Sequence, residues 1–405
     1  MSDQSSNTGT APEAPGSKHD NLPGILRRIR TRALLTAGVG AALCILGAIL
    51  DLTQLFRSYL VAFFFWLSIA LGCLGIQMLQ HVAPGGWGAV VRRPLEAASR
   101  TLPKLALLFV PILLGLPHLY PWARPEVIRE DASIAHKAYY LNLPFFVWRM
   151  VVYFALWAGF AYALSRMSLA QDKTGDPYLS RRMRTVSAVG LIFYCVTTTF
   201  ASIDWLMSLN PHWYSTIYGV YIIGGQAVSA MSFAILVMLF LADRSPIARA
   251  VRAQHFHDFG KMLLAFVMLW AYFAFSQFLV IWAGNLPEEV PYYADRTRDG
   301  WRWVSLALVL FHFALPFLLL LSRDIKRSAP RLAAVAGILL VMRWVDIYWL
   351  VTPAFHPEGI ALHWLDLAAT VAVGGIWIYL FAGELETRPL LPIQDPLLKE
   401  ATANG

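Results

Sequence analysis

The chain has 405 residues, of which 58% are hydrophobic and only 14% are charged. A soluble protein of this length needs far more polar surface to cover its core, so a soluble globular protein is excluded. The formal net charge is +8, but the basic residues border apolar blocks, where they orient a membrane chain and do not indicate nucleic-acid binding.

The apolar residues occur in blocks of about 20, which is the length that crosses a bilayer as a helix. Before the first block, residues 1–24 are polar and rich in Ser, Pro and Gly, without the pattern of a cleavable signal peptide. We therefore expect a disordered N-terminal tail over residues 1–24, a transmembrane domain over 25–386 and a C-terminal tail over 387–405.

Ten spans are predicted within the transmembrane domain. Most are flanked by Trp, Tyr or Arg, as membrane interfaces favour, and the alternation of a β-barrel is absent. The fold class is thus an all-α membrane protein. The expected spans are residues 33–52, 59–79, 102–120, 142–165, 185–207, 217–242, 257–284, 301–321, 331–351 and 361–384.

Lys and Arg are distributed unequally between the two sides of these spans. About 24 lie on the side of the termini, including those of a predicted loop with "VRRPLEAASR", and about 7 lie on the other side. This bias predicts that both termini are cytoplasmic and that the connection Ser202–Gly219, which holds no Lys or Arg, lies on the outer face.

The sequence predicts no metal site and no tightly bound cofactor. Cys44, Cys73 and Cys195 all lie in apolar blocks and form no CxxC or CxxCH motif. Phosphate loops, a GxSxG nucleophile and HExxH are also absent, so no catalytic residue is assigned. Redox centres would have to come from partners or from a diffusible carrier.

Ionisable side chains at membrane depth are costly and usually functional. Here they are spaced by depth, as a proton route through a helical bundle requires. The alternative is static pairing, in which Arg149 and Arg343 neutralise buried carboxylates and the inner cluster contacts lipid headgroups. The candidates for the route are Asp204, His312, Arg343, Asp346, His363 and Asp366, with His257, Asp258 and Lys261 at the inner mouth.

A quinone site needs a hydrogen-bond donor and acceptor at headgroup depth and an aromatic-walled slot. The outer ends of the spans from 142–165 to 257–284 offer such groups, although Trp and Tyr also form ordinary interfacial belts. The candidate quinone-binding residues are Arg149, Asp204, Trp205, His212, Trp213 and Tyr221.

Three stretches, taken in order, resemble a known family. They are "SIDWLMSLNPHWYSTIYGVYIIGGQAVSAMSFAI", "HDFGKMLLAFVMLWAYFAFSQFLVIWAGNLPEEVPYY" and "HPEGIALHWLDL". Together they are similar to quinone-binding subunit 2 of alternative complex III, of the NrfD/polysulfide-reductase-type membrane family. The resemblance covers about residues 30–385.

The resemblance implies ten transmembrane helices, with spans two to five and six to nine forming two related four-helix bundles. It implies a respiratory-chain subunit of a quinol:cytochrome c oxidoreductase in a bacterial inner membrane. The implied partners are a paralogous NrfD-like membrane subunit, an iron–sulfur subunit, and multihaem and monohaem cytochrome c subunits that carry the clusters and haem c. Whether quinol binds to this chain or to the paralogue is left open.

Two functions of other classes remain as alternatives. The chain could be a purely structural anchor that packs against its partners without quinone or proton chemistry. It could also be a stand-alone membrane acyltransferase or transporter, for which "HFHD" at residues 255–258 would supply a catalytic His beside a carboxylate.

Overall fold

The computed structural model describes residues 22–244, 247–395 and 398, which are almost entirely helical and contain no β-strand. Ten of the described helical segments are long and apolar enough to cross a membrane, so the chain is a multi-pass membrane protein, as predicted. Helices are the expected solution because a helix satisfies its own backbone hydrogen bonds inside lipid. Residues 1–21, on which most of the expected disordered tail falls, lie outside the described residues.

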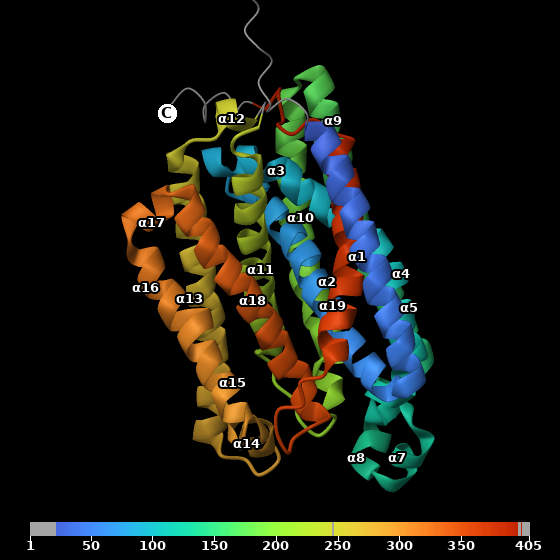
Figure 1. Cartoon of the computed structure of the whole chain (residues 1–405). Helices are drawn as coiled ribbons and strands as arrows, with labels where there is room; N and C mark the ends of the chain where they lie inside the picture. The colour runs from blue at the N-terminus through green and yellow to red at the C-terminus, as the bar shows by residue number, and fades with distance from the viewer. Residues whose placement is uncertain (1–21, 245–246, 396–397, 399–405) are drawn as a thin grey trace, which may run out of the picture.

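The spans run side by side between the two ends of the molecule (Figure 1). They are α1 (Leu22–Leu50), α2 (Leu52–Val82), a broken span made of α3 (Gly86–Ser99), α4 (Leu102–Leu108) and α5 (Val110–Leu114), α9 (Leu143–Thr174), α10 (Pro177–Trp205), α11 (Tyr218–Leu241), α13 (Ala253–Gly284), a span made of α15 (Trp301–Ala307), a π-helix (Leu308–Ala314) and α16 (Leu315–Leu321), α18 (Ala329–Val351) and α19 (Trp364–Glu386).

Short helices connect the spans at the two ends of the molecule. Helix α1 begins and α19 ends at the same end, called here the inner end, and α7, α8 and α14 lie at the opposite, outer end (Figure 1). The short elements are α6 (Leu116–Leu119), α7 (Pro125–Glu130), α8 (Ala132–His136), α12 (Ile247–Ala250), α14 (Val290–Thr297), α17 (Arg323–Arg327) and the 3-10 turns Pro121–Ala123, Lys137–Tyr139, Met207–Leu209 and Thr352–Ala354.

The spans pack as two four-helix bundles, as expected. Helix α2, the α3–α5 span, α9 and α10 form the first bundle, and α11, α13, the Trp301–Leu321 span and α18 form the second. Helices α2 and α11 pack against each other and join the bundles. In α2, 89% of the central apolar stretch is buried, against 22% in α1, so α2 is the core of the molecule.

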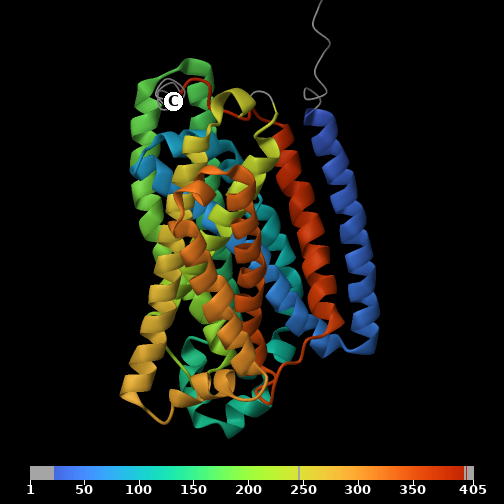
Figure 2. The same ribbon diagram turned by 60° about the vertical axis from the view of Figure 1, so that its left-hand side comes forward.

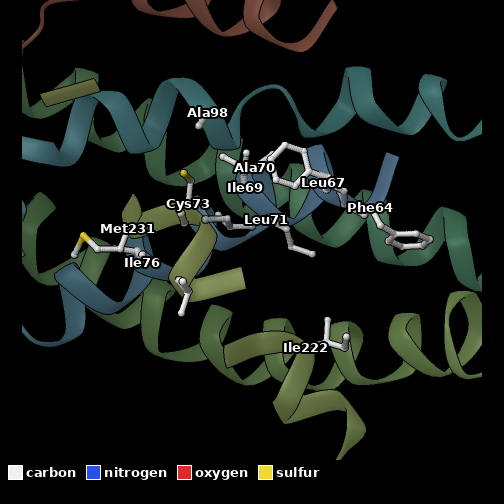
Figure 3. Packing of buried hydrophobic residues seen from close by; sticks show 14 of the residues in the cluster. Phe64, Leu67, Ile69, Ala70, Leu71, Cys73, Ile76, Ala98, Ile222 and Met231 are labelled. Atoms are coloured by element: carbon white, nitrogen blue, oxygen red, sulfur yellow. The ribbon is translucent and has the colours of Figure 1, made fainter. Parts of the chain in front are cut away.

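The contact between α2 and its neighbours is apolar and closely packed. Figure 3 shows Leu67, Leu71 and Cys73 of α2 between Ala98 of α3 and Met231 of α11. All five side chains are at most 2% exposed. Leu, Ile and Ala of this kind exclude water and fix the relative rotation of the two bundles.

Helices α1 and α19 flank the bundles as a pair, side by side at one edge (Figure 2). A Cβ added at Gly40 of α1 would lie 2.6 Å from the backbone nitrogen of Ala372 in α19. Small residues allow two membrane helices to approach in this way. Helix α19 also packs against α2, so it attaches α1 to the core.

Gly40→Ala is therefore expected to lower the thermal stability of the detergent-solubilised chain, at a cost of about 1–3 kcal/mol for overpacking. Gly38→Ala is the matched control, because a Cβ at Gly38 on the same helix meets no atom within 4 Å. A melting temperature that falls equally in both variants would show that the α1–α19 contact is not the cause.

One predicted loop is wrong. The stretch "VRRPLEAASR" lies in helix α3 and its end, and the side chains of Arg92 and Arg93 are 2% and 1% exposed. Arg93 forms ion pairs with Glu96 and with Asp172 of α9, so buried pairing, and not solvent, accommodates these charges. Several other helices also extend beyond their apolar blocks, since α10 begins at Pro177 and α2 at Leu52.

Candidate functional site

Each four-helix bundle contains an Asp–Arg pair in which the carboxylate is fully buried. In the first bundle, Asp204 of α10 is fully buried and Arg149 of α9 is 5% exposed. The Nε and Nη2 atoms of Arg149 donate to the two carboxylate oxygens of Asp204 at 2.8 and 2.9 Å. This two-pronged geometry is the strongest arrangement for a guanidinium and a carboxylate, and it joins α9 to α10 near their outer ends.

Other groups complete the hydrogen bonding of this first pair. The hydroxyl of Tyr153 donates to Asp204 at 2.8 Å, and Nη1 of Arg149 donates to the carbonyl of Tyr140 at 2.9 Å. The guanidinium also lies 3.9 Å from the ring centroid of Tyr140 and 4.3 Å from that of Phe145. Because both charged groups of this pair have hydrogen-bond partners, the pair is suited to holding α9 and α10 together.

The second pair lies within α18, where Arg343 and Asp346 are one helical turn apart, as the sequence predicts. Asp346 is fully buried and accepts hydrogen bonds from Tyr221 of α11 at 2.7 Å and from Trp270 of α13 at 3.2 Å. Nε of Arg343 donates to the hydroxyl of Ser229 at 3.2 Å. Three helices of the second bundle therefore meet at one carboxylate.

His312 lies beside this second pair and is fully buried. Its ring packs edge-on against Trp270, with 4.0 Å between ring centroids and 82° between planes. Neither ring nitrogen has a hydrogen-bond partner among the described residues. Trp270 thus contacts His312 with its ring and Asp346 with its N–H, which makes one cluster of the four residues Asp346, Arg343, Trp270 and His312.

The backbone around His312 is unusual. Residues Leu308–Ala314 form a π-helix, in which the amide of Leu315 donates to the carbonyl of Leu310, five residues back. Pro316 lies four residues after His312 and has no N–H to donate to the His312 carbonyl. The wider turn accommodates this missing bond, and such turns occur frequently at functional sites.

A small, mostly apolar cavity with a few polar groups in its wall lies between the two bundles. It has a volume of about 20 Å³ and is lined by Arg343 and Gln226 of the second bundle and by Thr198 and Trp205 of the first, among others. The Thr198 hydroxyl and the Trp205 N–H have no hydrogen-bond partner in the described part of the chain. A space of this size holds one water, which these groups could bind. Arg343 therefore faces both Asp346 and this cavity.

The candidate quinone residues do not form one slot. Arg149 and Asp204 form the first pair, Tyr221 belongs to the second, and Trp205 is packed among aromatic rings, with its ring centroid 4.8 Å from that of Phe109. The side chain of His212 is 61% exposed and lies 2.9 Å from Asp131 in the outer connection.

Trp213 lies apart from these groups and stacks on Tyr292 of α14, with 3.7 Å between centroids and 9° between planes. Burial raises the pKa of the Tyr292 hydroxyl, so this ring stays neutral at physiological pH. The stacked pair is suited to anchoring the outer connection Ser202–Gly219 to α14.

His363 and Asp366 occupy the start of α19. Asp366 accepts from the backbone N–H of His363 at 2.8 Å and from the hydroxyl of Ser58 in α2 at 2.5 Å. Nδ1 of His363 accepts from the amide of Leu365 at 3.2 Å. These contacts form a helix cap that ties α19 to α2 at the outer end.

The inner cluster lies at the start of α13, where Lys261 and Asp258 form a pair at 3.0 Å with side chains 54% and 30% exposed. His257 is half-buried, and its Nδ1 has no hydrogen-bond partner among the described side chains and backbone groups. Nδ1 of His255 accepts from the amide of Arg252 at 3.1 Å, so this imidazole caps the helix.

Sequence reasoning missed Tyr153, Trp270 and Ser229. Tyr153 follows Arg149 by one helical turn, which is a usable signal for a shared face. Trp270 and Ser229 stand in uniformly apolar stretches, where nothing distinguishes them from core residues. In the described part of the chain, no three His, Cys, Asp or Glu side chains converge as metal ligands would.

The fold and these clusters define a ten-span, all-helical membrane protein with a fully buried carboxylate paired with an arginine in each bundle. No model of a known protein family matches the chain, and no curated protein is significantly similar to it.

Proposed function

We propose that this chain is a membrane subunit of a quinol:cytochrome c oxidoreductase of the alternative complex III type, and that it moves protons coupled to quinol oxidation. The second cluster, with Asp346 and the unpartnered His312, carries the proposal. The family motifs of the sequence supply the reaction, in which quinol gives up protons and electrons and the electrons pass to haem and iron–sulfur partners. The termini would face the cytoplasm of a bacterial cell.

The chemistry follows from the contacts of Asp346. Its protonation would remove the charge that neutralises Arg343, whose other hydrogen-bond partner is the neutral Ser229. A buried guanidinium without a counter-ion is strongly disfavoured, so Arg343 would move toward the small cavity that it already lines, where Thr198 and Gln226 offer polar groups. One proton would thus shift a charged side chain between two positions. His312, whose ring packs against Trp270, is a further group of this cluster that is able to bind a proton.

The candidate quinone residues lie in separate places, namely the first pair, the second pair and the outer connection. This distribution favours a role in proton movement, and not quinone binding, for this chain. The acyltransferase alternative has little support, because His255 caps α13 and Asp258 is paired with Lys261. The remaining alternative is a structural anchor, and the closed Arg149–Asp204 pair is the observation that favours it.

The test compares Asp346→Asn with Asp204→Asn in the assembled complex, since both carboxylates are fully buried. We expect Asp346→Asn to lower turnover and proton release per assembled complex by at least ~10-fold, as loss of a positioned proton-transfer group does. Asp204→Asn is expected to reduce assembly or thermal stability and to leave turnover per complex nearly unchanged.

His312→Phe is a further variant for the same assay, because it keeps an aromatic ring against Trp270 and removes the proton-binding nitrogens. We expect it to impair proton release in the same direction as Asp346→Asn. If both variants turn over and release protons like the wild type, the proton role is wrong and the anchor remains.

A further inference from the structure

A second cavity lies at the inner end of the first bundle, away from both ion pairs. Its volume is about 210 Å³, far above the roughly 10–15 Å³ that one water needs. It is enclosed by the end of α2, by α3, by the start of α10 and by the C-terminal segment. The polar residues that line it are Gln80, His81, Arg92, Ser180, Arg181, Arg184 and Asp395.

Arg92 is the central group of this cavity. Its side chain is 2% exposed, and Nη2 forms an ion pair with Asp395. Its Nε and Nη1 atoms are buried and have no hydrogen-bond partner among the residues that the structure describes. A guanidinium carries five N–H donors and is always charged, so a buried one with two unused nitrogens is suited to an additional anionic acceptor.

Positive charges outnumber negative ones around the cavity. Arg92, Arg181 and Arg184 line it, and Asp395 is the only carboxylate among the described lining residues. Arg181 and Arg184 are exposed and therefore form its mouth. The neighbouring Arg93 differs, because it has two carboxylate partners, Glu96 and Asp172. The cavity thus keeps an excess of positive charge that the described residues do not neutralise.

We propose that this cavity binds a phosphate group, carried either by an anionic phospholipid of the inner leaflet or by a free phosphate. Arg92 would bind the phosphate oxygens through its unused nitrogens, and Arg184 would contribute at the mouth, since guanidinium groups bind phosphate with strong charge-assisted hydrogen bonds. Basic pockets between transmembrane helices on the cytoplasmic side are known sites for anionic headgroups. Asp395 would compete with the phosphate for Arg92, because its carboxylate already pairs with Nη2 of that residue.

The experiment uses the purified full-length chain with two probes. One is radiolabelled inorganic phosphate in equilibrium dialysis, and the other is phosphatidylglycerol in phosphatidylcholine nanodiscs, with retention measured by mass spectrometry. For whichever of the two probes binds the wild-type chain, we expect Arg92→Gln and Arg184→Glu to weaken binding about 10-fold or more, because each variant removes a charged hydrogen bond. Asp395→Asn is expected to tighten it, and Arg182→Gln, on the same helix but outside the cavity, is the control.

The two probes distinguish the sources of the phosphate group. Selective retention of phosphatidylglycerol without binding of inorganic phosphate assigns a lipid headgroup, and saturable binding of inorganic phosphate assigns a free phosphate. Arg184 is exposed, so Arg184→Glu tests the site even if Arg92→Gln fails to fold. The proposal is overturned if neither probe binds, or if Arg184→Glu binds as well as Arg182→Gln.

Discussion

Replacing Arg149 with methionine is expected to lower the free energy of unfolding by about 3–5 kcal/mol, the usual loss when one partner of a buried ion pair is removed. Asp204 is fully buried, and without Arg149 it would keep the hydrogen bond from the Tyr153 hydroxyl but no cationic partner among the described residues. The measurement is the melting temperature of the detergent-solubilised chain. Arg166→Met, at an exposed position on the same helix, is expected to change stability by no more than about 0.5 kcal/mol.

A double variant separates the charge from the packing. In Arg149→Met/Asp204→Leu both charges are gone, and apolar replacements of buried ion pairs are often neutral or stabilising. We therefore expect the double variant to recover most of the stability that Arg149→Met loses. A double variant no more stable than Arg149→Met would mean that the contacts of Arg149 with the rings of Tyr140 and Phe145, and not the ion pair, hold α9 to α10.

The spans could be predicted from the sequence because the bilayer imposes a length and a polarity on each helix. The Arg343–Asp346 pair could also be predicted, since residues three apart share a helical face. The partner of Arg149 could not be predicted from the sequence. Asp204 is 55 residues away, and the rotation of α9 against α10 that joins them depends on packing along their whole length.

Buried charge caused the main errors of sequence reasoning. Arg92 and Arg93 lie in a polar stretch that the sequence places in a loop, but both are buried because their partners Asp395 and Asp172 come from distant segments. His363 and Asp366 have the spacing of a helical pair, yet His363 precedes the helix and caps it. In both cases a local pattern has two structural solutions, and only the tertiary contacts select one.

The position of Arg343 depends on a residue that has no side chain. A Cβ at Gly225 of α11 would lie 2.4 Å from the Cζ and Nη2 atoms of Arg343, so the guanidinium occupies the space above this glycine. Asp346 and Ser229 hold the guanidinium from other directions. Any larger residue at position 225 would have to displace a charge that is 1% exposed.

Gly225→Ala is therefore expected to destabilise the chain by about 1–3 kcal/mol through overpacking and to lower turnover per assembled complex in the same assay as Asp346→Asn. Gly337→Ala is the matched control, because it lies on the helix of Arg343 and a Cβ there meets no atom within 4 Å. Two readouts separate the roles of the glycine. A fall in melting temperature without a fall in turnover would indicate packing alone, whereas a loss of turnover in complexes that assemble normally would show that the placement of Arg343 matters for proton movement.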